Sequence, residues 1–314
     1  MNALRNPVAS LTRDEWPALP LAAWKDTYAT LHMWTQIAGH VRMALSPKLN
    51  HFWNVTFYVT PRGLSTSAIP YQDGIFEIVF DFIEHKLVIS TSSGERKQIA
   101  LRPQAVADFY GELMSKLRSL GIEAHFHGAP DEVPDPIPFA EDRTHASYDP
   151  EYANRFWRIL VSVDKVFQQF RAGFIGKCSP VHFFWGSFDL AVTRFSGRRA
   201  PERSGTDLIT REAYSHEVSS AGFWPGSGEV NDAAFYSYTV PEPAGFAEAK
   251  VRPAAAFYDP KLKEFLLMYD EVRTAASPET TLMEFLQTTY EAGANLGHWD
   301  REALENPHSN QKTA

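Results

Sequence analysis

The sequence predicts an α+β protein built from two pseudo-symmetric helix–antiparallel strands–helix units. Long segments with apolar residues at helical spacing alternate with groups of short, alternating strands. The order of these segments also occurs twice along the chain. Copies of one unit commonly pack about a pseudo-two-fold axis, as the subunits of homodimers do. We therefore expect two antiparallel sheets, or one continuous sheet across that axis, with the long helices packed on one face.

The first unit is predicted over residues 21–127, after an N-terminal arm of residues 1–20. Its opening helix, residues 21–45, has one apolar face and ends at Ser46-Pro47, because proline stops a helix. Its closing helix starts at Pro103 and ends near Leu120, before a glycine. Between the two helices, alternation predicts strands at 52–60, 64–70, 75–82 and 87–91 and one more that reaches Leu101.

The segment 128–150 separates the two units and contains five prolines among acidic residues. This composition is typical of a linker or a strap on the surface, without regular structure. The second unit is predicted over 151–305, and residues 306–314 are expected to be a disordered tail. Its elements are expected to be a helix at 151–175, a strand at 182–195, a hairpin of 254–258 and 265–269, and a closing helix at 280–296.

A pair of matching motifs indicates internal duplication. Leu45-Ser46-Pro47 before His51-Phe52-Trp53 matches Cys178-Ser179-Pro180 before a strand that starts at His182. The second copy is about 43 residues longer, and the excess falls at about 198–252. A long insertion with its own aromatic residues is more often functional than not. We expect it to cover a site between the two matching strand starts.

Composition excludes several classes of function. The net charge of −8 and the pI of about 5.8 argue against nonspecific binding to nucleic acid or to an anionic membrane. No stretch approaches the length of about 18 apolar residues that a membrane helix needs, and the N-terminus lacks the apolar core of a secretory signal. The single cysteine, Cys178, cannot form an internal disulfide. A cytoplasmic protein is therefore expected.

Histidines are the first candidates for chemistry. His51 and His182 open strands predicted to be equivalent, and His216-Glu217 lies in the insertion, so these four residues are candidate catalytic groups with one histidine as general base. The same four residues would suit zinc or iron, although their spacing matches no known metal motif. Dispersed histidines more often lie at strand ends and bond to the backbone. No cofactor can be named from the sequence.

Aromatic residues are the second set of candidates. Trp34 and Trp53 are expected to line a pocket, and Trp224, between glycines and a proline, is expected to form its lid or wall. Arg211 and Tyr214 of the insertion are candidate polar contacts for the ligand. The leading hypothesis is thus a small-molecule site, either binding or enzymatic, under the insertion.

Two other functions remain open at this point. One is a non-catalytic partner-binding or assembly module that uses the aromatic residues Phe223 and Trp224. The other is a metal enzyme with histidine ligands. The sequence defines neither the substrate nor the reaction nor the oligomeric state.

Four segments of the sequence are distinctive. They are LHMWTQ at 31–36, YVTPRGL at 58–64, KCSPVHFFWGSFDLAVTRFSG at 177–197 and YSHEVSSAGFWPG at 214–226. Through them the chain, over about residues 19–305, resembles a family of uncharacterised bacterial proteins described only as a domain of unknown function. The resemblance implies one integral unit in the bacterial cytosol. It brings no activity, cofactor or catalytic residue.

Overall fold

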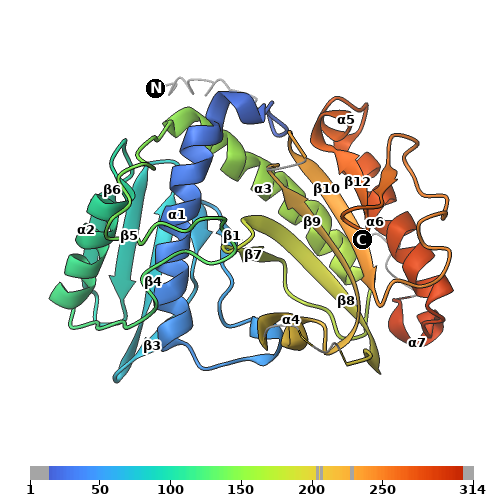
Figure 1. Ribbon diagram of the computed structural model, residues 1–314, viewed down its shortest axis with the longest axis horizontal. Coiled ribbons are helices and arrows are strands. Elements are labelled where there is room, and N and C mark those ends of the chain that lie inside the picture. The colour runs from blue at the N-terminus through green and yellow to red at the C-terminus, as the bar shows by residue number, and fades with distance from the viewer. Residues whose placement is uncertain (1–13, 203–204, 206–207, 227–229, 307–314) are drawn as a thin grey trace, which may run out of the picture.

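The computed structural model describes residues 14–202, 205, 208–226 and 230–306. Within them the chain forms two antiparallel sheets of six strands each and seven α-helices, which confirms the α+β class. In Figure 1, α1 lies in front of the first half near β3 and β4, and α3 runs beside β8. No helix in this part of the chain is both long and apolar enough to span a membrane.

The first half contains α1, the 3₁₀ turn η1, six strands and α2. Its sheet has the order β1-β2-β4-β5-β6, and β3 pairs with the start of β4. The predicted bounds of α1 are confirmed, and Gly121 ends the turn after α2 with a φ of 72°. The elements are α1 (Leu21–Leu45), η1 (Asn50–Phe52), β1 (Tyr58–Thr60), β2 (Gly63–Ser65), β3 (Ile69–Tyr71), β4 (Gly74–Asp81), β5 (Lys86–Thr91), β6 (Arg96–Ala100) and α2 (Val106–Ser119).

The second half contains α3, six strands and four further helices. Its sheet has the order β7-β8-β9-β10-β12-β11. Asp149 caps α3 by accepting hydrogen bonds from the backbone of Glu151 and Tyr152, and Pro150 is the first helical residue. The elements are α3 (Pro150–Ala172), β7 (His182–Phe184), β8 (Asp189–Arg199), α4 (Leu208–Ala213), β9 (His216–Trp224), β10 (Ala234–Val240), β11 (Phe257–Asp259), β12 (Glu264–Met268), α5 (Tyr269–Arg273), α6 (Pro278–Leu296) and α7 (Arg301–Leu304).

The two sheets meet at Phe57 and Phe183. Each of these residues donates its backbone N–H to the carbonyl of the other, at 2.8 Å in both directions. On either side of this pair the strand order is the same, since β1-β2-β4-β5-β6 corresponds to β7-β8-β9-β10-β12. The expected repeat is therefore present in the topology, with a pseudo-two-fold axis near the Phe57–Phe183 pair.

The helices cover one face of both sheets. Phe57 and Phe183 are fully buried on that face, against Phe80 of β4 and Phe156 of α3. In the second sheet, Arg194 of β8 donates to the carbonyl of Phe170 in α3. We call the opposite side the open face. The register of the second sheet places on it residues including His182, Ala191, Gly222 and Tyr236, which are neighbours across β7, β8, β9 and β10.

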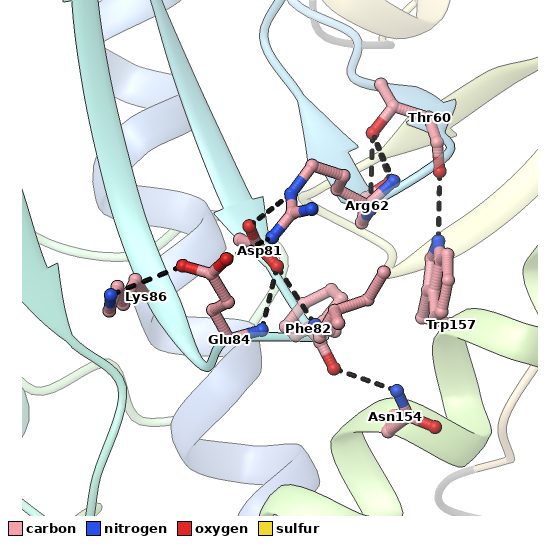
Figure 2. Close-up of polar contacts among 10 residues, drawn as sticks. Thr60, Arg62, Asp81, Phe82, Glu84, Lys86, Asn154 and Trp157 are labelled. Carbon is pink, nitrogen blue, oxygen red and sulfur yellow. Dashed lines mark hydrogen bonds and ion pairs between the residues drawn. The ribbon is translucent and has the colours of Figure 1, made fainter.

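Hydrogen bonds from two uncharged side chains attach α3 to the first sheet, beside a network of charged residues. Asn154 of α3 donates to the carbonyl of Phe82 at 2.8 Å, and Trp157 donates to that of Thr60 at 3.0 Å. Beside these contacts, Arg62 pairs with Asp81 at 2.5 Å and with Glu84 at 2.9 Å (Figure 2). Because every charge in this network has an opposite partner, we assign it a structural role.

The proline-rich segment is a strap and not a free linker. Residues 122–149 contain no helix or strand, as expected. The strap is fixed to α1, because the backbone N–H groups of Ser147 and Asp149 donate to Thr30 and Thr27. Within the N-terminal arm Trp16 is buried, whereas residues 1–13 and the predicted tail from 307 on lie outside the described residues.

Two predicted strands were wrong. Residues 52–60 do not form one strand, because His51 and Phe52 have left-handed φ values of 58° and 57° and belong to a turn. The segment 182–195 is a hairpin, broken between Phe184 and Asp189. Since Phe57 pairs with Phe183, the equivalent of His182 in the first half is Thr56 and not His51.

The prediction that residues 198–252 form an insertion that covers the site was also wrong. Residues 198–252 supply β9 and β10, which occupy the middle of the second sheet as β4 and β5 do in the first. Of the elements in this range, only α4 lies outside the sheet, beside η1 (Figure 1). The extra length comes from α4 and from the segments that connect β9, β10 and β11.

Candidate functional site

Three histidines from distant segments meet on the open face. The ring centroids of His51 and His216 are 5.8 Å apart, and that of Trp53 lies 5.3 Å from His51 and 5.7 Å from His182. Lys177 points its ammonium at the same indole ring, 5.4 Å from the centroid. We call these five residues, His51, Trp53, Lys177, His182 and His216, the histidine corner.

Local structure explains how each side chain reaches the corner. His51 lies in η1, where its left-handed backbone turns the side chain toward α4 and the start of β9. His182 is the first residue of β7, and His216 is the first of β9. Lys177 is held beside β8 because its carbonyl accepts the backbone N–H of Phe195 at 3.0 Å. The corner therefore depends on the tertiary fold and not on one sequence motif.

The hydrogen bonds of His51 define its tautomer. Its Nδ1 lies 2.9 Å from the carbonyl oxygen of Glu212, which can only accept, so Nδ1 carries the proton. Its Nε2 lies 2.6 Å from the Nζ of Lys177 and accepts a hydrogen bond from the ammonium group. Burial lowers the pKa of His51, and the charge of Lys177 lowers it further. His51 is accordingly neutral at physiological pH.

The other two histidines are neutral as well. Burial, reinforced by the charges of Arg42 and Arg171, lowers the pKa of His182 to about 3. Burial also lowers the pKa of His216, with the charges of Lys177 and Arg199 acting in the same direction. Neutral imidazole rings can each donate one hydrogen bond and accept another. The corner thus offers bases and hydrogen-bonding groups around one apolar ring.

Several predicted site residues lie elsewhere. Glu217 points away from His216, and its carboxylate accepts from Ser196 at 2.8 Å and from the guanidinium of Arg198 at 2.6 Å. Trp34 is fully buried in the first half, where it stacks on Phe109. Arg211 is exposed on α4, next to Glu212, whose carbonyl accepts from His51. Glu217 and Trp34 do not contribute to the corner, and Arg211 lies at its edge, where no hydrogen bond or ion pair within the described residues joins it to the corner.

Trp224 is also separated from the corner. It ends β9, which His216 begins eight residues earlier, so the two lie about 26 Å apart along the strand. It packs in a small apolar cluster with Val230 and Leu266. Its neighbour Phe223 is fully buried against Phe235 and Tyr269. Trp224 is therefore neither lid nor wall of this site.

A row of tyrosines continues along the open face. Tyr214, a predicted ligand contact, places its hydroxyl 3.1 Å from that of Tyr238, whose ring stacks on Tyr236 at 6.0 Å. The hydroxyl of Tyr236 donates to Asp189, a buried carboxylate whose pKa is raised by burial. Burial also raises the pKa of Glu264 to about 7. The sequence did not indicate Asp189, Tyr236 or Glu264 as site residues. Each lies in a different strand, β8, β10 or β12, and none belongs to a recognisable motif.

A groove of about 590 Å³ lies between the segment 245–252 and α6. It contains none of the predicted site residues. Its one acidic lining residue, Glu291, pairs with Arg301 at 3.3 Å. We therefore place the candidate site at the histidine corner and not in this groove.

The corner does not form a set of metal ligands. Within the described residues, no group of three or more histidine, cysteine, aspartate or glutamate side chains is arranged to hold a metal ion. The fourth residue of the predicted set, Glu217, is engaged by Arg198. The Nε2 of His51 is occupied by Lys177. The donor set therefore does not fit the zinc or iron site considered from the sequence.

Comparison with known proteins gives the family but no activity. The model of a family of unknown function (DUF5996) matches residues 16–306, nearly the whole chain. The protein belongs to this family. No significant match was found among curated proteins or among solved structures.

Proposed function

We propose that this protein binds a small molecule at the histidine corner. The observation that carries the proposal is that His51, His182 and Lys177 converge around the ring of Trp53. A third neutral histidine, His216, packs against His51 on the same face. Binding sites commonly combine an apolar wall with a few polar groups that fix the ligand's orientation. Trp53 supplies such a wall, and the imidazoles supply donors and acceptors.

The corner is reachable from solvent. Lys177 is exposed and Trp53 and His216 are half-buried, whereas His51 and His182 lie beneath them. A ligand would therefore approach past Lys177 and His216 and stack on Trp53. If the ligand reacts, His216 is the group placed to act as general base, because it is neutral and nearer to solvent, while the free lone pair of His51 is taken by Lys177.

The partner-binding alternative has lost its main support. It required an exposed aromatic surface around Phe223 and Trp224, but Phe223 is fully buried and Trp224 packs into an apolar cluster. Small-molecule binding is therefore the function that the corner favours. We also propose a cytoplasmic location in a bacterium, which rests on the single cysteine and on the family resemblance.

The proposal can be tested with three variants. The purified protein and the variants Trp53→Ala, His216→Ala and Trp224→Ala would be denatured, and the small molecules released would be identified by mass spectrometry. A thermal-shift screen of a fragment collection would run in parallel. We expect a compound that the wild type and Trp224→Ala bind and that the two corner variants do not. Stabilising compounds whose effect survives both corner substitutions would contradict the proposal.

A further inference from the structure

Arg42 is a buried cation for which the described residues supply no counter-ion. It lies in the last turn of α1, and its side chain is 7% exposed. Its Nε and Nη1 atoms have no hydrogen-bond partner among the described residues, and no carboxylate there pairs with it. Its guanidinium instead lies over the ring of Tyr58, 5.8 Å from the centroid. Burying a charge is costly unless it is paired, so this guanidinium, unpaired among the described residues, is suited to receive an anion.

His182 is the second buried group without a partner. Its side chain is 1% exposed, and within the described part of the chain neither ring nitrogen has a hydrogen-bond partner. Its ring lies 5.5 Å from that of Tyr58, over which Arg42 is placed. Arg42 is also close enough for its charge to act on the imidazole. Two groups without a hydrogen-bond partner among the described residues therefore both lie within 6 Å of the ring of Tyr58.

The surroundings of Arg42 and His182 are positive. The ammonium of Lys177 lies 5.4 Å from the ring centroid of Trp53 and donates a hydrogen bond to His51. The two acidic residues closest in sequence to Tyr214–His216 are already paired, because Glu212 contacts Lys48 and Glu217 contacts Arg198, each at 2.6 Å. Arg171 bonds to the carbonyl of Ser179 and adds a further positive charge near His182. In a chain with a net charge of −8, this local excess of positive charge calls for an anion.

We propose that the ligand of the histidine corner carries an oxyanion, a carboxylate or a phosphate group, that binds to Arg42 and His182. This inference rests on the proposed function and names the chemical class of its ligand. Arginine suits this role because its planar donors bind a carboxylate or phosphate in pairs. Imidazole adds one N–H donor. The remainder of the ligand extends over Trp53 toward Lys177 and His216.

The proposal predicts an unusual response of stability to mutation. A buried arginine that has no partner destabilises the ligand-free protein, so Arg42→Met, which keeps the apolar volume, should raise its Tm or leave it unchanged. An arginine with a purely structural role would give the opposite result. Arg62 is the matched control, because it pairs with Asp81 and Glu84, and Arg62→Met should lower the Tm.

Binding would be measured with inorganic phosphate and with benzoate, by calorimetry and thermal shift, at an ionic strength held constant with potassium chloride. The two probes distinguish a phosphate from a carboxylate ligand. We expect one of them to raise the Tm of the wild type and of Arg62→Met. We expect Arg42→Met to bind that anion roughly 10- to 100-fold more weakly, as the loss of a charged hydrogen-bonding pair implies.

Three results would overturn the inference. One is that neither anion binds the wild type. Another is an anion response that persists in Arg42→Met, which would indicate adventitious binding only. The third is an uncharged ligand, lost in Trp53→Ala, that binds Arg42→Met as well as it binds the wild type. This third result would leave small-molecule binding at the corner intact and would refute only the oxyanion.

Discussion

The Nε2 atom of His51 accepts a hydrogen bond from the Nζ atom of Lys177 across 2.6 Å, although 126 residues separate them in the sequence. The other ring nitrogen of His51 donates to the carbonyl of Glu212 at 2.9 Å, next to α4. This imidazole thus links η1, α4 and the segment before β7. Because burial lowers the pKa of Lys177 as well as that of His51, two groups of reduced basicity share one hydrogen bond.

The substitution Lys177→Met should raise the pKa of His51 toward its ordinary value of 6.5. The positive charge of Lys177 opposes protonation of the ring, and methionine removes that charge while keeping a similar length. An NMR titration of the ring nitrogens would measure the change. Lys116→Met, on α2, is the control and should leave His51 unchanged. An unaltered or lower pKa of His51 in Lys177→Met would refute this electrostatic account.

A second prediction concerns the close packing of Gly39 in α1 against Trp185 of the second half. A Cβ atom at Gly39 would lie 2.3 Å from the ring of Trp185, whose Nε1 donates to the carbonyl of Val55 at 2.7 Å. Gly39→Ala must displace this ring and should destabilise the protein by about 1–3 kcal/mol. A Cβ atom at Gly111, in α2, would meet no described atom within 4 Å outside its own helical turn. Gly111→Ala should therefore stabilise the protein by about 0.5–1 kcal/mol. Denaturant unfolding of both variants would show whether their effects have opposite signs.

Much of the fold was predictable because it follows from local patterns. The helical spacing over 21–45 gave both ends of α1, since a proline lies just beyond each end. The hairpin of 254–258 and 265–269 was found as β11 and β12, around the turn at Asp259. The repeated order of segments gave the pseudo-symmetry. These features depend on residues close together in the sequence, which alternation and helix-stop rules can detect.

What could not be predicted depends on tertiary contacts. Glycine or asparagine often marks a left-handed backbone position, but here the residue is His51, so the sequence did not reveal the turn. As a result, the sequence matches His51 with His182, whereas the true equivalent of His182 is Thr56. The extra length of the second half predicts an insertion at 198–252, although β9 and β10 lie there, and it predicts Trp224 near a site that lies about 26 Å away. In the sequence, Arg42 looks like an ordinary basic residue in the last turn of a helix. Only the fold shows that no carboxylate of the described residues reaches it.

The network of Figure 2 makes a pH-dependent prediction. Burial of Asp81 acts to raise its pKa, but hydrogen bonds from the backbone of Glu84 and Ile83 and from Arg62 lower it overall. A carboxylate whose folded pKa lies below 3.8 adds stability above that pH and loses it as the pH falls further. Asp81→Asn should therefore lower the Tm at pH 7 and have a smaller effect near pH 3. Equal losses at both pH values would show that the charge of Asp81 does not stabilise the fold.

Glu264 should show the opposite dependence on pH. Burial, together with the charges of Asp189 and Asp259, raises its pKa from 4.5 to about 7. The folded state therefore binds the proton more tightly than the unfolded state, and stability falls as the pH rises from 4.5 to 7. Glu264→Gln removes this loss, so it should stabilise the protein by about 1–3 kcal/mol at pH 8 and much less at pH 5.

Denaturant unfolding at both pH values would measure the effect of Glu264→Gln. Glu271→Gln, an exposed residue of α5, is the control and should change stability little at either pH. A gain of the same size at pH 5 and pH 8 would mean that the amide improves packing and that the carboxylate is not the source of strain. A loss at pH 8 would mean that the carboxylate of Glu264 is stabilised in the folded protein, contrary to its position beside the half-buried tyrosines of the open face.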